Sequence, residues 1–275
     1  MSLVLTGATS QIGFFLRPRL AQRGIAVAAI SRRPAADALP NERWLQADLA
    51  EGLPLAPLSE CRTLVSFGPL DGLGRWLRTQ SQLPFARLIA TGSMSVESKA
   101  DSQDAAERAL VARLQTAEAD IRQACERLGI AWTLLRPTLI YGAGLDKSLT
   151  PIARRAMRTR LFPIPMAQGL RQPVHADDIA QAVVAALDGR ADNLVVPIGG
   201  GERLPYQQMF ERVRASLPVA TLPVFVPQLV MQALTRLKPA LRGPVSRLDA
   251  DLIADNTRLI ERLGVQPRRF APVFA

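Results

Sequence analysis

The residues best suited to chemistry lie near the N-terminus, in the stretch Thr6–Gly13 with the sequence TGATSQIG. An apolar run, SLVL, precedes it and an amphipathic segment follows, so the stretch joins a strand to a helix. Gly7 would permit a sharp turn, Gly13 would let helix and strand approach, and the helix N-terminus would offer unpaired N–H groups to a pyrophosphate. Ser10 replaces the usual middle glycine with a small hydroxymethyl group, which would keep the cradle open. This pattern predicts a dinucleotide-binding loop; a turn without ligand is the alternative.

The residues after the second expected strand bear on which dinucleotide binds. That strand is Ile25–Ser31, and Arg32 and Arg33 follow it directly, with no carboxylate before Asp37. A fold that binds NAD tends to place an acidic residue here for the ribose hydroxyls, whereas NADP calls for arginine at the 2′-phosphate. The sequence therefore predicts NADP(H), with NAD the less favoured cofactor.

Strand and helix signals alternate along the first half of the chain and would position these residues. After the second strand, four further segments are typical of buried strands that run into turns: RWLQADL, RTLVSFG, ARLIATGS and IAWTLLRP. A long helix, roughly Asp104 to Leu128, separates the last two and ends at Gly129. This alternation predicts an α/β fold, a Rossmann-type doubly wound parallel sheet.

The character of the sequence changes after Pro137, where prolines become frequent and the alternation weakens. We therefore expect a NADP-binding Rossmann domain over residues 1–140, with returning elements near 174–198. Residues 141–275 are expected to form mainly a smaller, substrate-side α/β region. Within the returning elements, ADDIAQAVVAALDGR is predicted to be a helix capped by one of its first two aspartates.

Composition narrows the class of protein. The chain has 275 residues and a formal net charge of +10, from 34 basic and 24 acidic residues. Its arginines are scattered and not interleaved with aromatic residues, so a small-molecule substrate is expected and nucleic acid is not. Cys61 and Cys125 are too few for a disulfide framework, and no cluster has metal-ligand spacing, so we expect no metal site and a cytoplasmic location. The N-terminus lacks the basic flank and long apolar run of a secretory signal. The oligomeric state stays open.

One apolar segment raises the question of membrane contact. Residues 222–242, LPVFVPQLVMQALTRLKPALR, carry basic residues at one end but are interrupted by prolines, and no run reaches the length that spans a bilayer. Ordinary domain packing is the simpler interpretation. The alternative is a surface-lying amphipathic helix that holds the protein peripherally at the inner face of a membrane.

Several short motifs occur in a characteristic order. They are the TGATSQIG loop, Asp48-Leu49 after the third strand, Ser93 after the fifth, LLRPTLIYG at Leu134–Gly142 and VHADDIA at Val174–Ala180. Together they resemble the extended short-chain dehydrogenase/reductase family, and more narrowly its nucleoside-diphosphate-sugar epimerase/dehydratase group. The similarity runs from Ser2 to about Leu187 and is weaker towards the C-terminus.

The resemblance implies a role for each matching residue. The group that would hold the pyrophosphate comprises Gly7, Ser10, Gln11, Ile12 and Gly13. Around the rest of the cofactor would lie Arg32 and Arg33 (2′-phosphate), Asp48 and Leu49 (adenine), Phe67 and Gly68 (ribose), and Arg136, Pro137 and Thr138 (nicotinamide). The hydroxyl of Ser93 would bond the reacting carbonyl or alcohol. On the substrate side, Arg171 matches a family position that faces a substrate phosphate. Tyr141, near the cleft, and Lys147, within reach of a substrate anion, are further substrate candidates; a structural tyrosine and a surface lysine are the alternatives.

The family's Tyr-Lys pair is missing from this chain. Enzymes of the family carry YxxxK on the long helix, because the tyrosine moves a proton during hydride transfer and the lysine lowers the pKa of that tyrosine. Counting back from Glu118, which fits a family glutamate, places Leu110 at the tyrosine position and Leu114 at the lysine position. Neither of the two tyrosines in the chain has a lysine four residues later. A leucine cannot transfer a proton.

Two functions remain open from the sequence. The first is an oxidoreductase or epimerase-like enzyme on a nucleotide-sugar or similar anionic substrate, with the proton carried by water, Glu97 or Lys99, which follow the strand end at Ser93. The second is a non-catalytic NADP(H)-binding sensor or assembly subunit, which the missing pair favours. His175, the single histidine, matches a family position that ties a loop to a helix, so we expect it to be structural.

Overall fold

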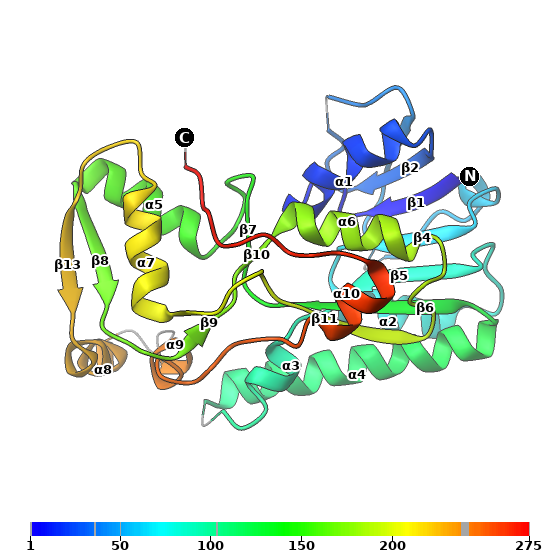
Figure 1. Cartoon of the computed structure of the whole chain (residues 1–275). Coiled ribbons are helices and arrows are strands. Elements are labelled where there is room, and N and C mark those ends of the chain that lie inside the picture. The colour runs from blue at the N-terminus through cyan, green and yellow to red at the C-terminus, as the bar shows by residue number, and fades with distance from the viewer. Residues whose placement is uncertain (1, 36, 50, 103, 238–241, 275) are drawn as a thin grey trace.

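A seven-stranded parallel sheet forms the centre of the N-terminal part of the molecule (Figure 1). The computed structural model describes residues 2–35, 37–49, 51–102, 104–237 and 242–274. In spatial order the strands are β11 (Leu194–Ile198), β6 (Ala131–Pro137), β5 (Arg87–Thr91), β4 (Thr63–Ser66), β1 (Ser2–Thr6), β2 (Ala26–Ser31) and β3 (Glu42–Gln46). The order reverses between β1 and β4, where doubly wound sheets open a crevice for ligands. The predicted fold class is confirmed.

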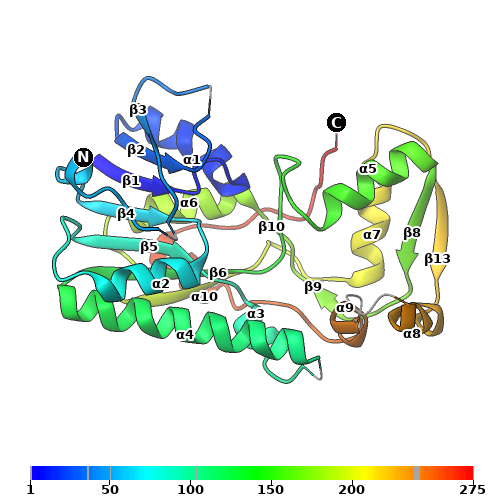
Figure 2. The ribbon, with the colours of Figure 1, turned by 180° about the vertical axis from the view of Figure 1, so that it is seen from behind.

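Helices cover both faces of this sheet, as expected for parallel strands (Figures 1 and 2). On one face α1 (Gln11–Gln22) packs against α6 (Ala176–Ala186), and on the other α2 (Leu70–Thr79) packs against α4 (Ala105–Leu128). Each face has its own apolar core. The sheet is therefore a rigid platform whose carboxyl-end loops lie at one edge.

The long helix has the bounds that its sequence predicts. The Asp104 side chain accepts a hydrogen bond from the Glu107 N–H at 3.0 Å and caps the start of α4. Gly129 ends the helix with φ +67°, a left-handed conformation that glycine adopts without a Cβ penalty. The N-cap of α6 differs from the prediction: the His175 ring, not an aspartate, accepts from the Asp177 N–H. The aspartates of α6 lie in its first turn and bind arginines instead.

Two segments of the second half of the chain return to the sheet domain. The first comprises α6 and β11, within the range that the sequence assigns to returning elements. The second is α10 (Thr257–Leu263), whose Leu259 and Leu263 join the core beneath α1 and α6. The sequence does not predict this second return, because a seven-residue helix has too few turns to show a clear periodicity.

A smaller lobe lies beyond the carboxyl edge of the sheet. Its larger elements are α5 (Leu149–Thr159), β8 (Leu161–Pro165), α7 (Tyr206–Ala215), β13 (Leu222–Val226), α8 (Gln228–Leu237) and α9 (Arg242–Ser246). Phe162 and Phe210 lie in its separate core. Short two-stranded ladders connect it to the sheet domain: β7 (Ile140–Tyr141) with β10 (Val174–His175), and β9 (Leu170–Arg171) with β12 (Leu204–Pro205). In the part of the chain that the structure describes, no helix has the length and apolarity to cross a membrane.

Both cysteines are buried and unpaired, and we expect neither to react in the folded protein. Burial raises the pKa of the Cys125 thiol to about 12, so almost none of it is thiolate at neutral pH. Ellman's reagent should therefore detect no thiol in native protein at pH 8 and both Cys61 and Cys125 after unfolding in denaturant. Rapid reaction of one thiol in the native state would contradict this packing.

Candidate functional site

The predicted phosphate loop lies between β1 and α1, at the point where the strand order reverses. Gly7 has φ +72°, and a Cβ there would lie 3.0 Å from the Phe67 backbone. A Cβ on Gly13 would lie 2.2 Å from the Ala8 carbonyl oxygen, so helix and turn approach each other as closely as the glycines permit. The loop therefore has the tight geometry of a dinucleotide-binding turn.

Ser10 has a local role in this loop. Its Oγ accepts a hydrogen bond from the Gly13 N–H at 3.2 Å and caps α1. The N–H groups of Gln11 and Ile12, in the first turn, have no intrahelical acceptor and stay available to an anion. The Gln11 Oε1 is buried without a hydrogen-bond partner among the described residues. The free N–H groups of the first turn fit a bound pyrophosphate, with Ser10 shaping the loop.

The two arginines after β2 border an open cavity beside the loop. Thr9, Ser31, Arg32 and Arg33 line this space of about 600 Å³. The Ser31 Oγ accepts from the Arg33 N–H at 3.1 Å, which turns the chain so that both arginines are exposed. Among the described residues no carboxylate forms an ion pair with either guanidinium. The cavity can thus receive a phosphate beside two available cations.

The residues predicted to surround the rest of the cofactor lie at the ends of β3 and β4. The Phe67 N–H donates to the Thr6 carbonyl at 3.0 Å, beside the start of the phosphate loop. Leu49 is buried and close to Gly68, where a Cβ would lie 3.0 Å from the leucine Cδ2. Asp48 immediately precedes Leu49. These residues share the crevice edge, and their contacts to adenine and ribose stay predictions.

A second cavity, of about 410 Å³, lies between the carboxyl edge of β5 and β6 and the smaller lobe. It brings together five residues that the sequence predicts for the site: Ser93, Lys99, Pro137, Thr138 and Arg171. Gln172, Tyr206 and Arg247 from the smaller lobe also line it. Glu97, Tyr141 and Lys147 do not. The cavity lies where the fold predicts a substrate site, because α/β sites form outside the carboxyl ends of the strands.

A buried carboxylate connects the two sides of this cavity. Glu107, on α4, accepts from the Arg247 Nε at 2.8 Å and from the Ser102 hydroxyl at 2.7 Å, and the Lys99 Nζ lies 3.3 Å from its Oε1. Burial by itself would raise the pKa of Glu107, but these hydrogen bonds and charges outweigh it and lower that pKa. Lys99 and Arg247 are therefore held in the wall by a shared carboxylate.

Arg171 is buried and much of its hydrogen-bonding capacity is used within the protein. Its Nη1 and Nη2 donate to the backbone carbonyls of Ala250 and Arg247 at 2.7 and 2.8 Å. Its guanidinium carbon lies 4.4 Å from the ring centroid of Tyr206. Arg171 thus fixes the cavity wall and the Tyr206 ring, and a direct contact with a substrate phosphate stays a prediction.

Arg136 is held between two carboxylates, one of which the sequence had assigned to proton transfer. Its Nε donates to the Glu118 Oε1 at 2.9 Å and its Nη1 to the Glu97 Oε1 at 2.7 Å. Glu118 is buried, and hydrogen bonding to it raises the pKa of Arg136. Glu97 is half-exposed, bound to this guanidinium and outside the cavity lining, so the geometry gives little support to Glu97 as the proton carrier.

The leucines at the expected Tyr-Lys positions lie one and two turns before Glu118 on α4. Leu110 and Leu114 are both half-buried, and Leu114 packs against the core between α4 and the sheet. Arg136 lies near the carboxyl end of β6. Because Glu118 pairs with it, the side of α4 that carries Leu110, Leu114 and Glu118 faces the carboxyl edge of the sheet. Neither leucine lines the cavity, and neither can exchange a proton there.

The remaining predicted residues have structural surroundings. Tyr141 is buried, and its ring centroid lies 5.0 Å from that of His175 and 4.9 Å from that of Phe270. Its hydroxyl donates to the Arg269 carbonyl at 3.3 Å. Lys147 is exposed outside both cavities described above. His175 caps α6, as its structural interpretation predicts.

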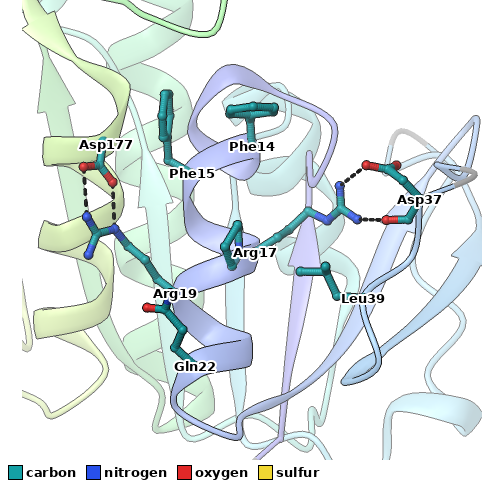
Figure 3. A pocket seen from close by; sticks show the side chains of 9 residues that line it. Phe14, Phe15, Arg17, Arg19, Gln22, Asp37, Leu39 and Asp177 are labelled. Atoms are coloured by element: carbon teal, nitrogen blue, oxygen red, sulfur yellow. Dashed lines mark hydrogen bonds and ion pairs between the residues drawn. The ribbon is translucent and has the colours of Figure 1, made fainter.

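The outer side of α1 carries a separate hollow of about 420 Å³ (Figure 3). Its charged groups bind one another: the Arg19 Nε donates to the Asp177 Oδ1 at 2.7 Å, and the Arg17 Nη2 donates to the Asp37 carbonyl at 2.7 Å. These pairs fasten α1 to α6 and to the loop before β3. The guanidinium groups of Arg17 and Arg19 in this hollow are therefore engaged within the protein, unlike the first-turn N–H groups of the phosphate loop on the same helix.

The lining residues that sequence reasoning missed include Gln172, Tyr206 and Arg247. Tyr206 follows a Gly-rich turn and starts α7, which gives no sign that it lines this cavity. Arg247 lies 140 positions from Glu107. Pairings at such separations leave no local pattern, so the fold alone reveals them.

Solved structures with the same fold include several enzymes that act on nucleotide-sugars. UDP-glucuronic acid 4-epimerase from Bacillus cereus, in complex with UDP-glucuronic acid and NAD, is 14% identical with a TM-score of 0.74, over 98% of this chain and 95% of the epimerase. UDP-glucose 4-epimerase from Thermotoga maritima is 15% identical with a TM-score of 0.71, over 97% and 94%. A NAD-dependent NDP-hexosamine 5,6-dehydratase of tunicamycin biosynthesis is 16% identical with a TM-score of 0.74, over 98% and 94%.

These similarities extend over nearly the whole chain, so both the sheet domain and the smaller lobe share the architecture of these epimerases and dehydratases. The fold implied by the sequence resemblance is confirmed. No protein-family model matches the sequence, and no curated protein is a significant match to it.

Proposed function

We propose that this chain is a nicotinamide-dinucleotide-dependent oxidoreductase or epimerase-like enzyme that acts on a nucleotide-sugar or a similar anionic small molecule. One observation carries the proposal: the phosphate loop and a cavity walled by Ser93, Lys99 and Arg247 open at the same edge of one sheet. The cations favour an anionic substrate. The proposed compartment is the cytoplasm, which suits two buried, unpaired cysteines.

The cofactor would be held by this chain's own loop. The N–H groups of Gln11 and Ile12 would bind the pyrophosphate, and Arg32 and Arg33 would bind a 2′-phosphate. The proposed cofactor is therefore NADP(H), although two of the structural neighbours named above, the UDP-glucuronic acid 4-epimerase and the dehydratase, use NAD. When bound, a nicotinamide dinucleotide supplies or accepts a hydride.

The substrate would be oriented by Ser93, whose hydroxyl lies in the cavity wall and would bond the reacting oxygen. The proton would come from Tyr206, which shares that wall. Burial raises the pKa of Tyr206, so the phenol keeps its proton at neutral pH and burial by itself makes it a weaker acid. The positive charges of Arg171 and Arg247 stabilise the phenolate that remains. Lys99, paired with Glu107, is the other cavity group that could hold a proton.

Replacing Tyr206 by Phe should slow the reaction by roughly 100-fold while NADPH affinity stays unchanged, because general acid catalysis contributes that much and more. The effect of the substitution is measured as the rate of hydride transfer to the substrate. Tyr141→Phe is the matched control, since it changes the other tyrosine of the chain, in the core outside the cavity. Equal rates for Tyr206→Phe and the unchanged protein would exclude Tyr206 as the proton donor.

A second candidate function is a non-catalytic sensor or assembly subunit that binds the same cofactor. The half-buried, apolar Leu110 and Leu114 favour it, because the usual acid–base pair of the related enzymes is then absent. Cofactor binding does not separate the two functions, since both require it.

Hydride exchange separates them. NADPH labelled at the transferable hydrogen would be incubated with the protein and a panel of nucleotide-sugars, and with a cell extract. Loss of label from the cofactor in the presence of one substrate class supports the enzyme. Label that stays on the cofactor across the whole panel, with NADPH bound, supports the sensor or subunit.

A further inference from the structure

The far side of the smaller lobe carries an exposed apolar face. Seven large apolar side chains there are between 43% and 78% exposed. They come from β8 and its end (Leu161, Met166), from β13 (Leu222, Val224, Phe225) and from α8 (Leu229, Val230). Single exposed apolar residues are ordinary, but a group on adjoining elements marks an interaction surface. Leu161, Leu222 and Val224 project from the same side of the β8–β13 pair, whereas Phe225 lies at the margin of the opposite side, paired with Ile164. We call these seven residues the apolar face.

The strand β13 is central to this face. It pairs with β8 in a two-stranded sheet at the outer end of the lobe (Figures 1 and 2). None of its five residues is buried, and its sequence, LPVFV, has no charged residue. Exposed apolar strands at a sheet edge are normally covered or charged, because they otherwise pair with other chains. On α8, Met231 turns inward against α9, which leaves Leu229 and Val230 outward.

Positive charge is concentrated in the same lobe. Residues 147–176 and 212–248, which include α5, β8, β13, α8 and α9, contain twelve Lys and Arg and no Asp or Glu. The rest of the chain contains the other 22 basic residues and all 24 acidic ones. The net positive charge of the protein therefore belongs to these two stretches.

Several of these arginines border the apolar face. The Leu222 N–H donates to the Arg160 carbonyl at 2.8 Å, so the exposed Arg160 lies where β13 begins. The Arg214 Nη1 donates to the Thr221 carbonyl at 2.9 Å, one residue before that strand. Arg154, Arg155 and Arg158 are exposed on α5, which packs against β8.

We infer that the apolar face and its arginines dock on an anionic lipid surface. Apolar side chains inserted at the headgroup boundary beside basic residues form the recognised footprint of an interfacial protein. A second copy of this chain would bring two faces of net positive charge together, which repulsion opposes; the acidic group next to the face is Asp249, which accepts from Gln228 at the start of α8. Nucleic acid would leave Leu222, Phe225 and Leu229 in water. This inference goes beyond the proposed function and does not depend on it.

Flotation of the full chain with lipid vesicles tests the inference. Binding should be strong to phosphatidylcholine vesicles that contain roughly a third phosphatidylglycerol, weak to phosphatidylcholine alone, and largely lost at ~1 M salt. The variant Arg154→Gln/Arg155→Gln/Arg158→Gln should weaken binding roughly 100-fold. The variant Leu222→Glu/Leu229→Glu, at the two most exposed positions of the apolar face, should weaken it by at least ~10-fold.

The matched controls change the same residue types in the sheet domain. Arg23→Gln/Arg62→Gln/Arg113→Gln removes three exposed arginines, and Ile260→Glu changes an exposed apolar residue on α10. Both should keep full vesicle binding. Equal loss for test and control variants, or no binding to anionic vesicles, would overturn the inference. So would a dimer, seen by sedimentation, that the Leu222→Glu/Leu229→Glu variant abolishes. NADPH affinity, measured in parallel, should be the same for every variant.

Discussion

Replacing Glu118 by Leu is expected to lower the free energy of unfolding by about 3 kcal/mol, because it leaves the buried Arg136 with only the half-exposed Glu97 as a partner. The side chain of Glu118 is 2% exposed and that of Arg136 is 15% exposed, so water cannot replace the lost carboxylate. For a chain of this size such a loss lowers the melting temperature by roughly 6–12 °C. Denaturant unfolding and thermal scans measure it.

A double-mutant cycle separates the ion pair from simple packing. Adding Arg136→Leu to Glu118→Leu removes the uncompensated charge, so the double variant should recover at least about 1 kcal/mol relative to Glu118→Leu. Glu126→Gln, at an exposed position on the same helix, should change stability by less than about 0.5 kcal/mol. If the double variant were less stable than Glu118→Leu, the unpaired charge of Arg136 would not be the cause of the stability loss in the single variant.

The second large effect concerns cofactor choice. Replacing both Arg32 and Arg33 by Ala should weaken NADPH binding by about 100-fold and change NADH binding little. Each guanidinium can form charge-assisted hydrogen bonds to a 2′-phosphate, a group that NADH lacks. Both side chains border the cavity beside Thr9 without a carboxylate partner among the described residues, so their loss leaves the fold intact. Fluorescence titration of each reduced cofactor measures the two affinities.

The same titrations also show whether this chain prefers NADP(H) or NAD. If the wild-type protein bound NADH at least as tightly as NADPH, the 2′-phosphate role of these arginines would be refuted. NAD would then be the favoured cofactor. Equal losses for both cofactors would mean that the arginines act on the shared part of the dinucleotide. Arg154→Ala/Arg155→Ala, an exposed adjacent pair in the smaller lobe, is the matched control and should affect neither affinity.

Features that depend on neighbours in sequence could be predicted without the structure. The α4 bounds follow from a capping residue, a helical period and a terminal glycine. The phosphate loop follows from glycines at positions where a Cβ would meet backbone atoms. The alternation of strands and helices was enough to predict the parallel sheet, since parallel strands require crossovers. Short elements such as α10 carried too little periodic signal.

The sequence by itself thus determined the fold class, the cofactor loop, the arginines after β2 and the absence of a Tyr-Lys pair. Only the tertiary structure decided which side chains meet at the cavity. It placed Tyr206 and Arg247 in the wall with Ser93, and it bound Glu97 to Arg136 outside that wall. The reason is physical: a helical cap or a tight turn is decided by residues a few positions apart, whereas contacts such as that of Glu107 with Arg247 join elements that only the packing of two lobes brings together.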